Sequence, residues 1–79
     1  GITVNAVSPG PIATEMFFSN NPPDSPTTKA IIDGIPMKRI GGVQDVAAAA
    51  LFFLSDAAAF TTGQNLFVCG GSSVGRALP

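Results

Sequence analysis

One short segment has the residue types needed to bring a ligand close to the main chain, Ser8-Pro9-Gly10-Pro11-Ile12-Ala13-Thr14. Pro9 and Pro11 have no amide hydrogen and Gly10 has no side chain, so a ligand can approach the backbone closely there. The segment follows the β-type residues 2–8, and ligands of open α/β sheets bind at the carboxyl ends of strands. The pattern predicts a ligand-binding edge, and the alternative is an ordinary turn that ends a strand.

The elements that position this segment follow a strand–helix–strand pattern. Residues 2–8 are β-branched and apolar with little polar alternation, as in a strand that is covered on both faces. Within them, Asn5 is expected to satisfy neighbouring backbone groups. A helix is expected over 43–57 and a second strand over 65–69. Since such crossovers are right-handed almost without exception, the two strands are expected to be parallel.

The helix over 43–57 has both a start signal and an apolar face. Gly41-Gly42 precedes it, and Asp45 in its first turn suits the positive end of the helix dipole. Arg39 is expected to pair with Asp45 at the start of this helix. The apolar residues at the spacing of one buried face are Val46, Ala50, Phe53, Leu54 and Ala57.

The segment between the first strand and this helix is rich in proline. Thr14 resembles a helix start, and residues 20–26 form a loop because their three prolines fit neither a helix nor a central strand. Pro26 then suits the first position of a short helix that stops at Gly34. Residues 35–37 are expected to be extended, since the residue before a proline avoids the α region.

Composition excludes several functions. The 79 residues allow one small domain, and the formal charge of −1 without a basic run argues against nucleic acid. The longest apolar run, 46–54, is far shorter than the roughly 20 residues that span a bilayer. No histidine is present for a metal cluster, and no secretory pattern is seen. The single cysteine, Cys69, is expected to be a small buried residue, with a reactive thiol as the alternative, and suits a cytoplasmic location.

The balance of residues also suggests a piece of a larger protein. The chain is 46% hydrophobic and 11% charged, whereas soluble domains are typically about 25% charged. It starts at Gly1, already close to a strand-like pattern. We therefore expect a fragment whose apolar faces belong against sequence outside these 79 residues.

Four stretches share their residues and order with a known family: Gly1 to Thr14; Pro36-Met37-Lys38-Arg39-Ile40-Gly41 with Asp45-Val46-Ala47; Phe53-Leu54-Ser55; and Thr62-Gly63-Gln64-Asn65-Leu66 closing on Gly70-Gly71. Together they resemble the C-terminal portion of a short-chain dehydrogenase/reductase. One departure is Cys69, because relatives commonly carry aspartate before the two glycines. The tail 72–79 has no clear period.

The resemblance implies an α/β fold, the C-terminal βαβ part of a Rossmann-like doubly wound parallel sheet. By this resemblance, 2–8 and 65–69 are its sixth and seventh strands, and 43–57 is its last large helix. The segment 15–36, between the first of these strands and that helix, resembles the mobile substrate lid that closes over the cofactor. Residues 1–79 would thus be a C-terminal fragment of one Rossmann-fold domain.

The same resemblance implies a site for NAD or NADP. Pro9, Gly10 and Pro11 would pass beside the nicotinamide ring, the main chain at Ile12 would bond the carboxamide, and the Thr14 hydroxyl would reach the carboxamide or the pyrophosphate. One extended residue can satisfy a carboxamide with its own amide and carbonyl. Three further residues are either core or the apolar wall of a substrate pocket: Met16, Phe17 and Phe18.

The chain has no tyrosine, which this family uses as its general acid/base, so it is expected to hold no catalytic residue. Because it also has no histidine, no metal site is expected. The predicted function is the C-terminal part of an NAD(P)-dependent oxidoreductase that interconverts an alcohol and a ketone, with a homo-oligomeric parent. The alternative is a non-catalytic assembly fragment that docks on a partner supplying the rest of the sheet. A third, weaker alternative is an unrelated nucleotide-binding α/β domain.

Overall fold

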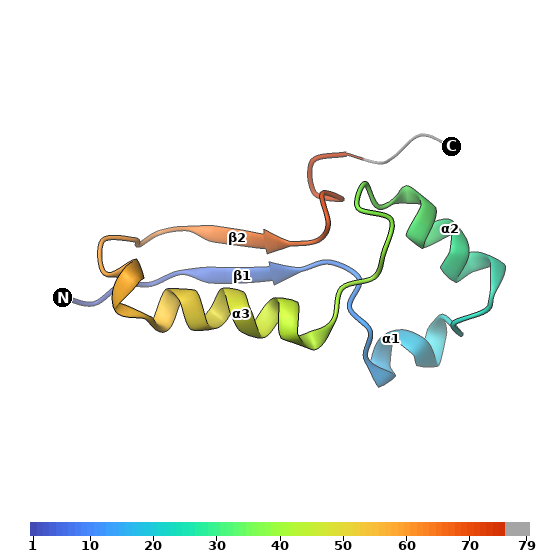
Figure 1. The fold of residues 1–79 in the computed structure, drawn as a ribbon, viewed down its shortest axis with the longest axis horizontal. Helices are drawn as coiled ribbons and strands as arrows, with labels where there is room; N and C mark the ends of the chain where they lie inside the picture. The colour runs from blue at the N-terminus through green and yellow to red at the C-terminus, as the bar shows by residue number, and fades with distance from the viewer. Residues whose placement is uncertain (76–79) are drawn as a thin grey trace.

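The chain folds into a two-stranded sheet with one helix on its face and two short helices beyond one end of the strands (Figure 1). The computed structural model describes residues 1–75. The elements in chain order are β1 Ala6–Pro9, α1 Glu15–Asn20, α2 Pro26–Gly34, α3 Val43–Leu54, a 3-10 helix Asp56–Ala58 and β2 Asn65–Val68.

The two strands are parallel, as the crossover rule predicted. Ala6 pairs with Asn65 and Pro9 with Val68, and α3 lies against both strands. Both strands point toward the end of the molecule where α1 and α2 lie (Figure 1). The carboxyl ends of the strands therefore meet the segment 10–41, which is where a ligand of an α/β sheet is expected.

The first strand is shorter than predicted and is shifted along the chain. It covers Ala6–Pro9 and not 2–8, because the residues before Ala6 have no strand opposite them. Val4 instead bonds the turn before β2: its amide donates to the Thr62 hydroxyl at 3.0 Å, and its carbonyl accepts the Gly63 amide at 2.8 Å. The second strand ends at Val68, one residue earlier than predicted.

Asn5 ties the start of β1 to that same turn. Its side-chain amide donates to the Thr61 carbonyl, and its side-chain oxygen accepts the Gln64 amide, both at 3.0 Å. This confirms the prediction that Asn5 satisfies neighbouring backbone. The two bonds fix the point from which the parallel pair starts.

Helix α3 begins where predicted but ends earlier. Its last residue is Leu54 and not residue 57, because Ser55 is extended and its hydroxyl donates to the Phe52 carbonyl at 2.6 Å. The chain then makes one 3-10 turn over Asp56–Ala58. A serine that bonds the preceding turn competes with helix propagation.

The buried face of α3 also differs from the predicted one. Ala49 is buried, and Val46, Ala50 and Phe53 are half-buried beside the sheet. Leu54 is 83% exposed and Ala57 is exposed, so the prediction was wrong for both. The early end of the helix removes Ala57 from this face, whereas Leu54 is still helical and is not covered by the described residues.

The two short helices start at the predicted caps. The Thr14 hydroxyl oxygen accepts the Phe17 amide at the start of α1. Pro26 is the first residue of α2, and Gly34 is the last. Residues 35–37 were expected to be extended, which holds for Ile35 only, because a turn follows in which the Lys38 amide donates to the Ile35 carbonyl at 2.8 Å.

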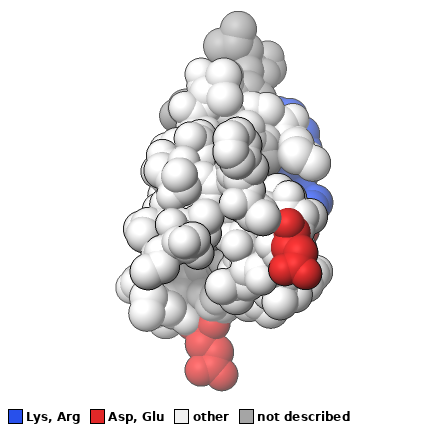
Figure 2. Space-filling model, turned by 90° about the vertical axis from the view of Figure 1, so that its left-hand side faces the viewer, with Lys and Arg blue, Asp and Glu red and all other residues white. Residues whose placement is uncertain are grey.

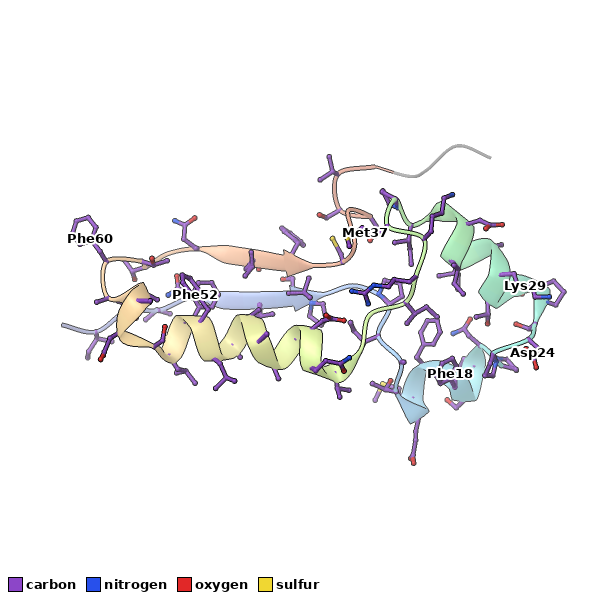
Figure 3. All side chains as sticks on the ribbon, in the orientation of Figure 1. Phe18, Asp24, Lys29, Met37, Phe52 and Phe60 are labelled. Atoms are coloured by element: carbon purple, nitrogen blue, oxygen red, sulfur yellow. The ribbon has the colours of Figure 1, made fainter. Side chains whose placement is uncertain are left out.

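Few residues are buried, and the molecule is thin, with extents of 48 × 27 × 14 Å. Among the described residues, the buried hydrophobic side chains are Ile35, Ala49 and Ala58. Phe60 is fully exposed at the end opposite α1 and α2 (Figure 3). Figure 2 views that end and shows mostly uncharged surface. Within residues 1–75, no helix combines the length and apolar character needed to cross a bilayer.

Candidate functional site

Three segments cross at the carboxyl ends of the strands: the Pro-Gly-Pro loop (residues 9–14), residues 36–41, and the turn 69–72 after β2 (Figure 1). The Gly10 amide donates to the Val68 carbonyl at 2.9 Å, which extends the pairing of β1 with β2 by one bond. On the side away from β2, main-chain hydrogen bonds join the loop to Gly41 of the segment 36–41. The loop is thus held by main-chain bonds from both neighbours.

The bonds to Gly41 leave one residue of the loop without a main-chain partner. The Gly41 amide donates to the Pro11 carbonyl at 3.0 Å, and the Ala13 amide donates to the Gly41 carbonyl at 2.8 Å. This is a parallel bridge centred on Ile12, so the amide and carbonyl of Ile12 face away from Gly41. Neither group takes part in a hydrogen bond among the described residues. One donor and one acceptor therefore lie side by side on a fixed backbone.

Gly10 allows close packing at the crossing of the loop with the turn 69–72. A Cβ atom on Gly10 would lie 2.8 Å from the Cys69 Cβ and 2.9 Å from its Cα. Carbon atoms in contact prefer about 3.5–4.0 Å. The space on the Cβ side of Gly10 is therefore occupied by Cys69, which gives a packing reason for a glycine at this position. A role for Gly10 in cofactor binding stays a prediction.

Gly41 is the functional position that sequence reasoning missed. A Cβ atom there would lie 2.9 Å from the Ile12 Cδ1, the end of a flexible side chain, so a larger residue at this position would displace the Ile12 side chain. The sequence signal was the glycine that closes the stretch 36–41, a stretch interpreted only as a family motif and a helix start. Met37 fixes the other end of the same segment, because its amide donates to the Gly70 carbonyl at 3.0 Å (Figure 3).

Arg39 and Asp45, which flank Gly41 in the sequence, form an ion pair at the start of α3. The Arg39 guanidinium lies 3.2 Å from the Asp45 carboxylate, which confirms the predicted pair. The same carboxylate accepts the Gly42 amide at 2.7 Å. This amide, and secondly Arg39, hold the pKa of Asp45 below its usual 3.8. Because the Arg39 side chain is 56% exposed, the pair contributes little stability, and its role is to fix the start of α3.

The Thr14 hydroxyl caps the start of α1 and still has its own hydrogen to donate. Its hydroxyl oxygen accepts the Phe17 amide at 3.1 Å, and its own hydrogen has no acceptor among the described residues. Met16 is 81% exposed, whereas Phe17 and Phe18 are half-buried with their rings edge to face, 5.4 Å apart. Substrate contacts by these three residues stay a prediction.

Cys69 is half-buried and makes polar contacts, so its interpretation as a small buried residue was wrong. Its thiol lies 3.2 Å from the Ser73 hydroxyl, and its sulfur accepts the Ser73 amide at 3.4 Å. These bonds lower the pKa of the Cys69 thiol from 9.0 to about 7. In the part of the chain that the structure describes, no group of three or more potential metal ligands is found.

A βαβ unit whose crossing loop lies at the carboxyl ends of parallel strands is the building unit of α/β proteins, whose ligands bind at that edge. The family described as enoyl-(acyl carrier protein) reductase matches residues 1–73. Glucose 1-dehydrogenase 2 of Bacillus subtilis is 42% identical over 74 residues, which are 94% of this chain and 28% of that protein. The chain belongs to the short-chain dehydrogenase/reductase family.

Solved structures agree with this family. A protein from Agrobacterium tumefaciens, proposed to be a 2-deoxy-D-gluconate 3-dehydrogenase and solved with bound NADP, matches with a TM-score of 0.84 and 40% identity, over 94% of this chain and 30% of its own. A 7α-hydroxysteroid dehydrogenase in complex with NADH and 7-oxo glycochenodeoxycholic acid matches with a TM-score of 0.78 and 39% identity, over 90% of this chain and 27% of its own. The chain thus spans less than a third of these relatives.

Proposed function

We propose that this chain forms the nicotinamide-binding edge of an NAD(P)-dependent oxidoreductase that interconverts an alcohol and a ketone. The observation that carries the proposal is the unpartnered amide and carbonyl of Ile12. A carboxamide offers one acceptor and two donors, so these two groups can bind it together. The neighbouring bonds to Gly41 hold them in place before the cofactor arrives, which lowers the ordering cost of binding.

Each residue of the loop has a distinct role in this proposal. Ile12 binds the carboxamide and so fixes which face of the ring meets the substrate. The free hydrogen of the Thr14 hydroxyl donates to the carboxamide or to a pyrophosphate oxygen. Pro9, Gly10 and Pro11 shape the backbone that passes beside the ring. When bound, the cofactor supplies or accepts the hydride.

The chain itself positions the cofactor and does not transfer the proton. It has no tyrosine and no histidine, and the proposal gives none of its residues the role of general acid. Relatives include one structure with NADP and one with NADH, which supports a dinucleotide cofactor and leaves both as candidates. The named relatives are enzymes, so the alternative of an assembly fragment is not favoured.

The segment 15–36 is proposed to act as the substrate lid. Its helices α1 and α2 lie beyond the strand ends, next to the Pro-Gly-Pro loop (Figure 1). The side chains proposed to line the substrate are Met16, Phe17 and Phe18. A homo-oligomeric parent and a cytoplasmic location complete the proposal as predictions from the sequence.

The test removes the Ile12 amide hydrogen. Ile12→Pro in the protein that carries this chain keeps the carbonyl of residue 12 but also removes the isoleucine side chain and fixes φ, and it should raise the Kd for NADP⁺ or NAD⁺ roughly tenfold, because one cofactor group loses its partner. Ile12→Ala is the control for the lost side chain and should bind as the wild type does. Isothermal titration calorimetry measures both, and unchanged binding by Ile12→Pro would refute the assignment.

A further inference from the structure

The ion pair of Arg39 with Asp45 holds the main chain on both sides of Gly41. One carboxylate oxygen, the Asp45 Oδ2, accepts the Gly42 amide at 2.7 Å and lies 3.2 Å from the Arg39 Nη1. The same guanidinium nitrogen donates to the Ile40 carbonyl at 3.4 Å. The pair therefore bonds the residue before Gly41 and the residue after it.

These two bonds are made to the peptide groups that carry the Gly41 amide and carbonyl. The Ile40 carbonyl and the Gly41 amide belong to one peptide group, and the Gly41 carbonyl and the Gly42 amide belong to the next. Both groups are trans, so each is planar and its carbonyl and N–H point in opposite directions. Holding the outer ends of the two groups therefore aims the Gly41 amide and carbonyl away from the ion pair.

The two groups aimed in this way are the ones that hold the Pro-Gly-Pro loop. The Gly41 amide donates to the Pro11 carbonyl at 3.0 Å, and the Gly41 carbonyl accepts the Ala13 amide at 2.8 Å. Between them, the Ile12 amide and carbonyl have no partner among the described residues. A continuous series of hydrogen bonds and rigid peptide groups thus runs from the ion pair to the residues on both sides of Ile12.

Helix capping alone does not account for this arrangement. An acidic residue at the third position of a helix commonly bonds the amide of the residue before the helix, and Asp45 does so at the start of α3. Capping requires neither the bond from Arg39 to the Ile40 carbonyl nor a bridge from Gly41 to another segment. Because the Arg39 side chain is 56% exposed, the pair adds little to global stability, and its effect is expected on the direction of the two peptide groups.

We propose that Arg39 and Asp45 are positioning residues for the cofactor, because they aim the Gly41 amide and carbonyl at the loop and so keep the Ile12 main chain open for the carboxamide. The inference rests on the proposed function, since it assigns two further residues to that same site. Neither side chain has to touch the cofactor. Loss of either should loosen the loop and weaken cofactor binding while α3 stays folded.

Amide hydrogen exchange tests the effect on the loop without cofactor, in the protein that carries this chain. Each rate is divided by that of the Ser8 amide inside β1, so that a change in global stability does not raise the ratio. Asp45→Ala should raise the ratio for the Ala13 amide roughly fivefold, because its acceptor on Gly41 is no longer held. The control is Ala49→Gly, which weakens α3 at its buried middle and should not raise the ratio. No rise with Asp45→Ala, or an equal rise with the control, would overturn the inference.

A second variant, Arg39→Met, separates the two peptide groups and decides the matter if Asp45→Ala does not fold. It keeps the apolar stem of the side chain and removes the donor to the Ile40 carbonyl. Because that carbonyl shares its peptide group with the Gly41 amide, exchange of this amide should rise roughly threefold, and exchange of the Ala13 amide should rise less. An unchanged Gly41 amide would overturn the inference.

Isothermal titration calorimetry with NADP⁺ and NAD⁺ tests the effect on the cofactor. Asp45→Ala should raise the Kd roughly fivefold, and Asp45→Glu, which restores the carboxylate, should recover most of the affinity. Ala49→Gly should bind as the wild type does. Binding by Asp45→Ala as tight as by the wild type, or equal weakening by Ala49→Gly, would contradict a positioning role.

The two proposals fail in different ways. If the wild type binds neither NADP⁺ nor NAD⁺, the proposed function is refuted, and the exchange rates of the Ala13 and Gly41 amides still decide whether the ion pair holds the loop. If the wild type binds a cofactor and Asp45→Ala changes neither these rates nor the Kd, the positioning role alone is refuted.

Discussion

Replacing Gly10 by alanine places a methyl group where the Pro-Gly-Pro loop crosses the turn after β2. The new Cβ would lie 2.8 Å from the Cys69 Cβ and 2.9 Å from its Cα. The first distance is about 0.7 Å short of the roughly 3.5 Å at which two carbon atoms meet comfortably. Because the opposing atoms are Cα and Cβ, no side-chain rotation relieves the contact, and the two segments must move apart.

The expected cost follows from two terms. Overpacking of this kind costs about 1–3 kcal/mol. The bond from the Gly10 amide to the Val68 carbonyl, 2.9 Å long, lies at the same crossing, and its weakening adds up to about 1 kcal/mol. We therefore expect a loss of about 3 kcal/mol in the free energy of unfolding. Gly10 does not have a positive φ, so without the contact alanine would instead stabilise by about 0.4–1 kcal/mol.

The assay is urea unfolding followed by far-ultraviolet circular dichroism. Gly75→Ala is the matched control, because no atom of the described residues lies within 4 Å of its added Cβ, and its effect should stay within about 0.5 kcal/mol. Adding Cys69→Gly to Gly10→Ala removes one of the two contacts and should recover part of the loss. The reasoning is refuted if Gly10→Ala is as stable as Gly75→Ala.

Three further predictions concern the segments around the loop. Lys38 has a φ of 62°, so Lys38→Gly should stabilise the protein by about 1 kcal/mol relative to Lys38→Ala in the same urea assay, and equal stability of the two variants would contradict backbone strain. The lowered pKa of Asp45 means that its charge stabilises the fold above pH 3.8 and that this contribution is lost as the pH falls through the lower folded-state value. The stability gap between wild type and Asp45→Asn should therefore close in acid, and a gap constant from pH 2 to 7 would disprove the link. The Cys69 thiol, with its pKa of about 7, should reach half its maximal alkylation rate by iodoacetamide near that pH, and Ser73→Ala should move this midpoint toward 9; an unmoved midpoint would exclude the Ser73 hydroxyl as a cause.

The parts of the fold that depend on local chemistry could be predicted from the sequence. Thr14 caps α1, and Pro26 and Gly34 begin and end α2, because each acts on its own backbone or that of its neighbours. The parallel order of the strands followed from the crossover between them. Asn5 was predicted because a polar side chain in an apolar strand needs partners.

The parts that depend on distant contacts were missed, and so was one local signal. The local signal is Ser55: the apolar pattern of α3 continues past Leu54, but the helix ends there because Ser55 bonds back to Phe52, three residues earlier. The close contact of Gly10 with Cys69 joins segments far apart in the sequence, so the glycine was explained by a ligand instead. The bridge at Gly41 was missed for the same reason, although it is what leaves Ile12 free.

The central claim is that the main chain of Ile12 is held open for the nicotinamide carboxamide. Its most direct test is the backbone ¹H–¹⁵N spectrum of the protein that carries this chain during titration with NADP⁺ and NAD⁺. The Ile12 amide signal should move downfield as it gains an acceptor, and the Ala13 amide, already bonded to Gly41, should move much less. Saturable cofactor binding that leaves the Ile12 signal unmoved, or that shifts Ala13 equally, would contradict the claim.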